Sequence, residues 1–212
     1  MLTNTSILYH IFSLCAIMNF VKRVLIYGDS NTWGYNSTGG RYENRWPRLL
    51  AGYEIVEEGV NGRTTVFDDD KPYRNGLRGL GYVLMAAKPI DLLIIQLGIN
   101  DLKFTDALGS GAGLREILDS LIDIDIKYPG ANAAIFNDIR RILIVSAVES
   151  DDEESKKLAS IYQKIAEEYN CFFLNPNIFV KSNDIDHVHL DEVNHRKLAI
   201  AMQLVIDNIL GE

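Results

Sequence analysis

Cysteine is scarce in this sequence of 212 residues, which contains only Cys15 and Cys171. Two cysteines do not make a disulfide framework, and neither has a second cysteine at the spacing of a redox motif or a zinc site. Cys171 opens the apolar run CFFL, which is typical of a small buried residue. The sequence therefore predicts neither a disulfide-stapled fold nor a cysteine-bound metal.

Basic residues are outnumbered by acidic ones, 21 to 29, so the formal net charge at pH 7 is −8. An acidic surface repels phosphate backbones, and we therefore expect no nucleic acid among the partners. Hydrophobic residues make up 47% of the chain, which at this length is enough for one domain with a real core.

Long hydrophobic runs are also missing from the N-terminus. Residues 1–17 are moderately apolar but too short and too interrupted to span a bilayer, with no Lys or Arg ahead of the apolar part and no A-x-A cleavage site. We expect residues 1–20 to form a peripheral extension and residues 21–212 a single domain, with no membrane span and a cytoplasmic location. A poor signal peptide and a natural start at Met18 are the alternatives for this segment.

Five apolar runs of strand length lie along the chain, with segments of helical spacing between them. The runs are continuous rather than alternating, which is typical of strands buried on both faces of a parallel sheet. The sequence therefore predicts an α/β fold, a three-layer α/β/α domain around a doubly wound, five-stranded parallel sheet. The expected strands are Val24–Tyr27, Tyr53–Val56, Leu92–Leu97, Ile142–Val148 and Phe172–Leu174. The expected helices are Leu114–Tyr128, Ser150–Tyr169 (with a capping box of Ser150 and Glu153) and a segment after Asp191.

Ligands of such sheets bind beyond the carboxyl ends of the strands, so the residues that follow each strand are the candidates for a site. Ser30 follows the first expected strand and precedes a helical turn expected near Thr32. A serine there lies at the positive end of a helix dipole and can supply both an attacking oxygen and an N–H donor, if a base lies within reach. The plainer alternative is a serine that only caps the helix.

Two further post-strand residues can donate hydrogen bonds to an oxyanion. Gly62 has no side chain to keep its N–H from a substrate, and Asn100 carries an amide donor. With the N–H of Ser30 they would form an oxyanion hole, in which each donor is typically worth about 3–4 kcal/mol of transition-state stabilisation. Taken singly, each is better explained by a tight turn or a helix start.

A base is expected in the segment from Asp184 to His189. It contains two D-x-x-H pairs, Asp184 with His187 and Asp186 with His189. In either pair the carboxylate can hold the Nδ1–H of the imidazole, which leaves Nε2 to take a serine proton. Chemistry alone does not separate the two pairs.

Together these segments resemble the sequence blocks of the SGNH hydrolase (GDSL esterase/lipase) superfamily, in particular its arylesterase and acyltransferase branch. The first block of that superfamily commonly reads GDS-[LIN]-T-x-G, and here residues 28–34 read GDSNTWG. Residues 57–65, EEGVNGRTT, resemble the glycine block of the superfamily, and residues 98–101, GIND, resemble its G-x-N-D block. In the last block the catalytic histidine stands six residues before a second one, as His189 stands before His195.

This resemblance implies a flavodoxin-like SGNH hydrolase fold and a serine esterase. It implies Ser30 as the nucleophile, with Asp186 and His189 completing the catalytic triad. It also implies an oxyanion hole formed by Ser30, Gly62 and Asn100.

Substrate-binding residues are expected at Trp33 and Arg63. Arg63 is similar to a position near the pocket of the family, although an ion pair with Asp68–Asp70 would explain it as well. Aromatic residues near the site are as easily explained by packing. The other candidates for the pocket wall are Tyr35, Trp46 and Leu102–Phe104.

We therefore expect the hydrolysis of small carboxylic (acyl or aryl) esters through an acyl-serine intermediate, with no metal and no cofactor. The expected partner is a small-molecule ester substrate, and a homo-oligomer is left open. The alternatives that use the same triad are an acyltransferase or perhydrolase and a carbohydrate acetylesterase. The remote alternative is a non-catalytic flavodoxin-like binding protein, for which the sequence has no G-x-x-x-x-G-K-[ST] and no G-x-G-x-x-G.

Overall fold

The central sheet has five parallel strands in the order β4-β1-β5-β6-β7. The computed structural model describes residues 21–122, 134–137 and 139–211. The strands are β1 (Arg23–Gly28), β4 (Glu54–Gly59), β5 (Leu92–Gln96), β6 (Ile142–Val145) and β7 (Phe172–Leu174). The predicted five-stranded parallel sheet is confirmed.

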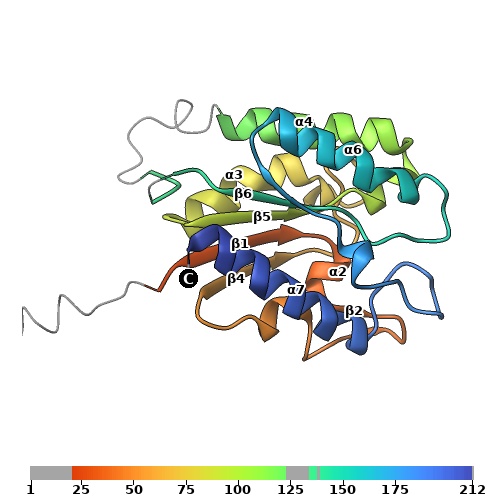
Figure 1. The fold of residues 1–212 in the computed structure, drawn as a ribbon. Helices are drawn as coiled ribbons and strands as arrows, with labels where there is room; N and C mark the ends of the chain where they lie inside the picture. The colour runs from red at the N-terminus through yellow and green to blue at the C-terminus, as the bar shows by residue number, and fades with distance from the viewer. Residues whose placement is uncertain (1–20, 123–133, 138, 212) are drawn as a thin grey trace, which may run out of the picture.

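Helices cover both faces of this sheet, which gives the three layers seen in Figure 1. One face is covered by α3 (Gly76–Ala87), α4 (Ala107–Ile122) and α6 (Ser155–Glu168), and the other by α7 (Glu192–Leu210). Strand β1 shows why both faces are apolar. Its Leu25 and Tyr27 pack into the core under α3, α4 and α6, whereas Val24 and Ile26 pack into the core under α7. The predicted α/β/α layering is therefore confirmed.

Short elements fill the carboxyl-terminal edge of the sheet and the loops. The hairpin of β2 and β3 and several short helical turns are too brief to show as periodic patterns in the sequence. They are α2 (Ser30–Trp33), β2 (Tyr35–Asn36), β3 (Gly40–Arg41), and the 3-10 helices η1 (Trp46–Leu49), η2 (Pro72–Arg74), η3 (Ile99–Lys103) and η4 (Pro176–Ile178).

The start of helix α6 differs from the prediction. Helix α6 begins at Ser155, so the capping box predicted for Ser150 and Glu153 is wrong. The Ser155 hydroxyl instead accepts a hydrogen bond from the Ser150 N–H at 2.9 Å, and Glu154 accepts one from the N–H of Ala107 at the start of α4. Through Glu154, the turn before α6 is therefore joined to the start of α4.

The remaining helix predictions fare differently. The helix after Asp191 is confirmed as α7, and the Asp191 carboxylate caps it by accepting the Asn194 N–H at 2.7 Å. Helix α4 starts at Ala107, earlier than expected, and the predicted end at Tyr128 lies outside the described residues. Helix α3 was not expected at all, because three glycines interrupt its apolar pattern.

Residues 1–20 lie outside the part of the chain that the structure describes, so the peripheral extension stays a prediction. In the described ranges, none of the helices combines the length and the apolar character that crossing a membrane requires.

Candidate active site

A cavity of about 460 Å³ opens at the carboxyl ends of the central strands. All four segments that were expected to carry chemistry contribute to it or lie directly behind it. The cavity is lined by Ser30, Tyr35, Asn61, Gly62, Arg74, Ile99, Asn100, Leu102, Lys103, Ser150, Asp152, Val188 and His189. Its size suits a small molecule.

Ser30 is the first residue of α2 and stands directly beyond β1. The Asp29 carboxylate caps this turn by accepting the Asn31 N–H at 2.9 Å. Gly59, at the end of β4, lets α2 pack against the sheet, because a Cβ there would lie 2.4 Å from the Trp33 nitrogen. The turn therefore holds the serine at the edge of the cavity, and Ser30 as a whole residue is 5% exposed.

His189 joins Ser30 to Asp186 through two hydrogen bonds. Its Nε2 lies 2.9 Å from Ser30 Oγ, and its Nδ1 lies 2.7 Å from Asp186 Oδ2. Burial raises the pKa of Asp186, but hydrogen bonds from the backbone N–H and ring of His189 and from the Val188 N–H outweigh it and hold that pKa well below its usual range. Asp186 is therefore a carboxylate that fixes the proton on Nδ1, which leaves the lone pair of Nε2 for the serine hydroxyl.

The structure also separates the two histidines of this loop. His187 adopts a positive φ of 58° and its ring turns outward, 3.6 Å from Asp151. Asp186 Oδ1 accepts the N–H groups of Val188 and His189, both at 3.0 Å, so the loop curls around this carboxylate and carries His189 inward. Of the two D-x-x-H pairs, only Asp186 with His189 reaches Ser30.

Asn31 fastens the histidine loop to the serine turn. Its side-chain oxygen accepts the Leu190 N–H at 2.9 Å, and its Nδ2 donates to the Val188 carbonyl at 3.2 Å. Both neighbours flank His189, so Asn31 sets the distance between nucleophile and base. This role of Asn31 was not predicted, because the contact joins segments far apart in the chain.

Three N–H donors face the cavity. Gly62 has a φ of 80°, which favours glycine, and a Cβ there would lie 2.7 Å from Arg74 Nε. The backbone N–H groups of Ser30 and Gly62 have no acceptor among the described residues. Asn100 donates one of its two Nδ2 hydrogens to the Arg63 carbonyl at 3.2 Å, which leaves the second hydrogen for a ligand. These are the donors expected for an oxyanion hole.

A buried carboxyl group ties the two oxyanion loops together. Asp101 accepts the N–H and the hydroxyl of Thr65, at 2.8 and 2.7 Å, and the Ser110 hydroxyl at 2.8 Å. Burial raises its pKa to about 6 although these hydrogen bonds lower it. Because Asp101 follows Asn100 and Thr65 lies close behind Gly62, this cluster fixes the spacing of their donors.

The two expected substrate-binding residues lie away from the cavity. The Arg63 guanidinium is buried beneath the site, where it donates to the carbonyls of Gly28 and Glu58 and lies 4.0 Å from the centre of the Tyr27 ring. Arg63 therefore supports the strand ends and does not line the cavity, and its contact with substrate stays a prediction. Its alternative partners are engaged elsewhere, because Asp68 pairs with Arg78 and Asp69 with Arg74.

Trp33 is covered by Arg41, whose guanidinium lies 4.9 Å from the ring centre, and it does not line the cavity. Tyr35 takes the expected aromatic place, because its ring centroid lies 4.6 Å from that of His189. Arg74 lines the wall beside Gly62 and was not expected there, since no local pattern reports a contact between two loops. Trp46 is fully buried in the core.

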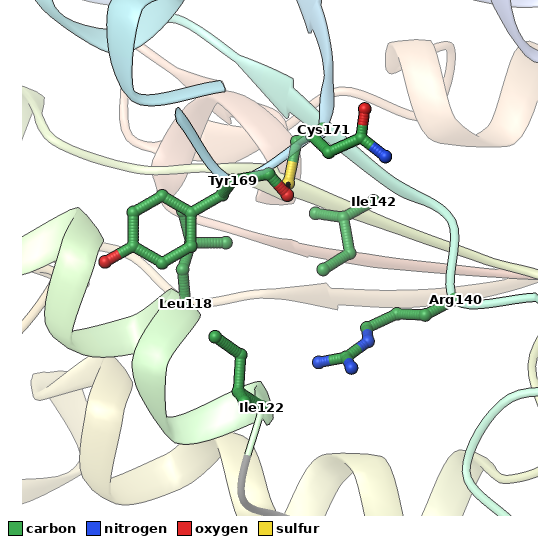
Figure 2. Close-up of a pocket in the computed structure, with 7 residues that line it drawn as sticks. Leu118, Ile122, Arg140, Ile142, Tyr169 and Cys171 are labelled. Atoms are coloured by element: carbon green, nitrogen blue, oxygen red, sulfur yellow. Dashed lines mark hydrogen bonds between the residues drawn. The ribbon is translucent and has the colours of Figure 1, made fainter. Parts of the chain in front are cut away.

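A second cavity, of about 360 Å³, lies at the opposite ends of β6 and β7 (Figure 2). Leu118 and Ile122 of α4 face Ile142 and Arg140 across it. Burial raises the pKa of the Cys171 thiol there to about 11, although Arg140 lowers it, so this cysteine is not activated as a nucleophile. Over the described ranges, no group of three or more His, Cys, Asp or Glu side chains is arranged to hold a metal ion.

The chain resembles known hydrolases in both sequence and fold. The model of the GDSL-like Lipase/Acylhydrolase family matches residues 26–197. A carbohydrate acetylesterase family member from Sinorhizobium meliloti is 33% identical, with a TM-score of 0.79 over 91% of this chain and 100% of that one. The aryl esterase of M. smegmatis is 26% identical, with a TM-score of 0.75 over 90% of this chain and 100% of that one.

Another carbohydrate acetylesterase from Sinorhizobium meliloti is 26% identical, with a TM-score of 0.77 over 89% of this chain and 99% of that one. Among curated proteins, no sequence matches. The matched range runs from β1 to α7 and includes each of the residues that meet at the larger cavity. The protein therefore belongs to the GDSL-like lipase/acylhydrolase family and is a serine esterase, a carboxylic ester hydrolase.

Proposed function

We propose that the protein hydrolyses small carboxylic esters through an acyl-enzyme formed on Ser30. The observation that carries this proposal is the chain of hydrogen bonds from Ser30 Oγ through His189 to Asp186 at the edge of a cavity. A serine hydroxyl is a weak nucleophile, and a neutral imidazole held in the correct tautomer is what activates it.

In the first half of the reaction, Ser30 Oγ attacks the ester carbonyl while His189 Nε2 takes the hydroxyl proton. The carbonyl oxygen becomes an oxyanion that the N–H groups of Ser30 and Gly62 and the Asn100 amide stabilise. Collapse of this tetrahedral intermediate breaks the ester bond, and His189 returns the proton to the leaving alcohol. Water then attacks the acyl-serine with His189 again as base, which releases the acid and restores Ser30.

The cavity supports a preference for short acyl chains. Its volume of about 460 Å³ is at the lower end of the range for small-molecule pockets. The apolar wall is short, formed mainly by Ile99, Leu102 and Val188, and charged side chains such as Arg74 and Asp152 stand at its sides. A long alkyl chain would have to lie against these charges or in water.

Hydrolysis of a p-nitrophenyl ester series tests this proposal. We expect kcat/KM for the acetate and butyrate to exceed that for the palmitate by at least about tenfold, because methylenes beyond the cavity gain no burial. Adding excess methanol and analysing the products by chromatography shows whether water or methanol accepts the acyl group. We expect free acid as the main product. A rate that rises with chain length, or a methyl ester as the main product, would contradict the proposal.

A further inference from the structure

We propose that Lys103 is a positioning residue of the oxyanion hole, which orients and polarises the amide of Asn100. The inference rests on the proposed function, because it concerns the donor that Asn100 supplies to the same reaction. Lys103 is the last residue of η3, three positions after Asn100, and it lines the cavity. Its Nζ donates a hydrogen bond to Asn100 Oδ1 at 2.8 Å.

The two ends of the Asn100 amide are held by partners of opposite character. Oδ1 accepts from the Lys103 ammonium, and Nδ2 donates to the Arg63 carbonyl. A half-turn of the amide would bring its NH₂ group against an ammonium and its oxygen against a carbonyl, and both contacts would be repulsive. The amide therefore keeps one orientation, with its second N–H left for the oxyanion.

The position of the Arg63 carbonyl is itself fixed. The N–H of Arg63 donates to the Val60 carbonyl at 3.0 Å, and its side chain is buried beneath the strand ends. The Asn100 amide is therefore held between a rigid acceptor on one side and a lysine on the other.

The charge of Lys103 is not neutralised by a carboxylate. Within the part of the chain that the structure describes, no Asp or Glu forms an ion pair with it. Its charge has a coulombic interaction with the buried Asp29 carboxyl, whereas its hydrogen bond goes to the Asn100 oxygen. A charged donor at an amide oxygen draws electron density from the N–H bonds at the other end. Asn100 becomes a stronger donor, most of all when the oxyanion has formed.

A second reading of the same residue is direct contact with an anionic substrate. That reading predicts a change in KM for charged esters, whereas positioning of Asn100 predicts a change in kcat for a neutral ester. The hydrogen bond from the Lys103 Nζ to Asn100 Oδ1 favours positioning.

A double-mutant cycle of Lys103→Met and Asn100→Ala tests the inference with p-nitrophenyl acetate. We expect Asn100→Ala to lower kcat about 10²- to 10³-fold, and Lys103→Met to lower it about tenfold with KM little changed. Because the lysine acts through the amide, Lys103→Met in the Asn100→Ala background should cost less than about twofold more. Lys103→Arg should recover most of the loss, and Lys164→Met, on the exposed face of α6, is the matched control with the same change of charge.

Binding of phenylboronic acid gives a readout that does not depend on turnover, because its adduct with a serine places an oxygen in the oxyanion hole. We expect Lys103→Met to weaken this binding by about the same factor as it lowers kcat, with an unchanged far-UV CD spectrum and melting temperature. Equal losses in both backgrounds, or a change in KM alone, would overturn the inference. If Asn100→Ala lowers kcat but Lys103→Met does not, only the inference fails; if Asn100→Ala has no effect, the oxyanion assignment in the proposed function fails with it.

Discussion

Replacing Ser30 by alanine is expected to lower kcat for p-nitrophenyl acetate by about 10⁴- to 10⁶-fold. Without the hydroxyl no acyl-enzyme can form, and what remains is direct attack by water aided by the oxyanion donors. The fold should be unaffected, since within residues 21–122, 134–137 and 139–211 the Ser30 side chain makes a single hydrogen bond, to His189. The backbone N–H of residue 30, which is one of the oxyanion donors, is retained in the variant.

Ser160→Ala is the control for this loss, because Ser160 is an exposed serine on α6 whose hydroxyl donates to the Lys157 carbonyl of its own helix. Its rate should stay within about twofold of wild type. Steady-state kinetics of both variants, with melting temperatures to confirm folding, decide the matter. A Ser30→Ala protein that keeps more than about one hundredth of the wild-type rate would mean that another group is the nucleophile.

The two histidines of the last loop should differ by several orders of magnitude when each is replaced by alanine. We expect His189→Ala to lower kcat by about 10⁴- to 10⁶-fold, because Ser30 loses its base and the leaving alcohol its acid. We expect His187→Ala to stay within about threefold of wild type, because its ring points toward Asp151 and not toward Ser30.

Each variant serves as the control for the other, since both substitutions lie in one loop and remove the same type of side chain. Parallel measurements of kcat with p-nitrophenyl acetate are sufficient. Similar losses in the two variants would indicate that the loop is being disturbed as a whole. A larger loss in His187→Ala would assign the base to the other D-x-x-H pair.

The sheet could be predicted because its strands are buried on both faces. Runs such as Leu92–Gln96 are apolar at every position, which is a local property of the sequence. The end of β4 was missed because Glu57, Glu58 and Gly59 continue an edge strand whose residues are only half-buried. Helix α3 was missed because its glycines make room for neighbours, as where Gly79 lies against the Tyr27 hydroxyl.

The residues of the candidate site were predictable to the extent that strand ends gather them. Ser30 and Asn100 follow neighbouring strands, β1 and β5, and the sheet topology alone brings them to one edge. The choice between the two histidines was not available from the residues, because it depends on how Asp186 folds the loop around its own carboxylate.

The walls of the cavity were the least predictable part. Arg63 and Arg74 belong to one loop region, yet the first turns beneath the strand ends and the second toward the cavity. The two arginines differ in their tertiary contacts. Arg63 contacts the Gly28 carbonyl and the Tyr27 ring, whereas Arg74 pairs with Asp69 beside Gly62. Contacts between loops leave no periodic pattern in a sequence.

Identification of the residue that a fluorophosphonate labels is the measurement that tests the central claim most directly. The reagent forms a stable adduct with an activated serine, and mass spectrometry of the digested protein locates the adduct. We predict one adduct per chain, on Ser30, with labelling abolished in Ser30→Ala and strongly slowed in His189→Ala. An adduct on any other residue, or labelling of Ser30→Ala at the wild-type rate, would contradict the account.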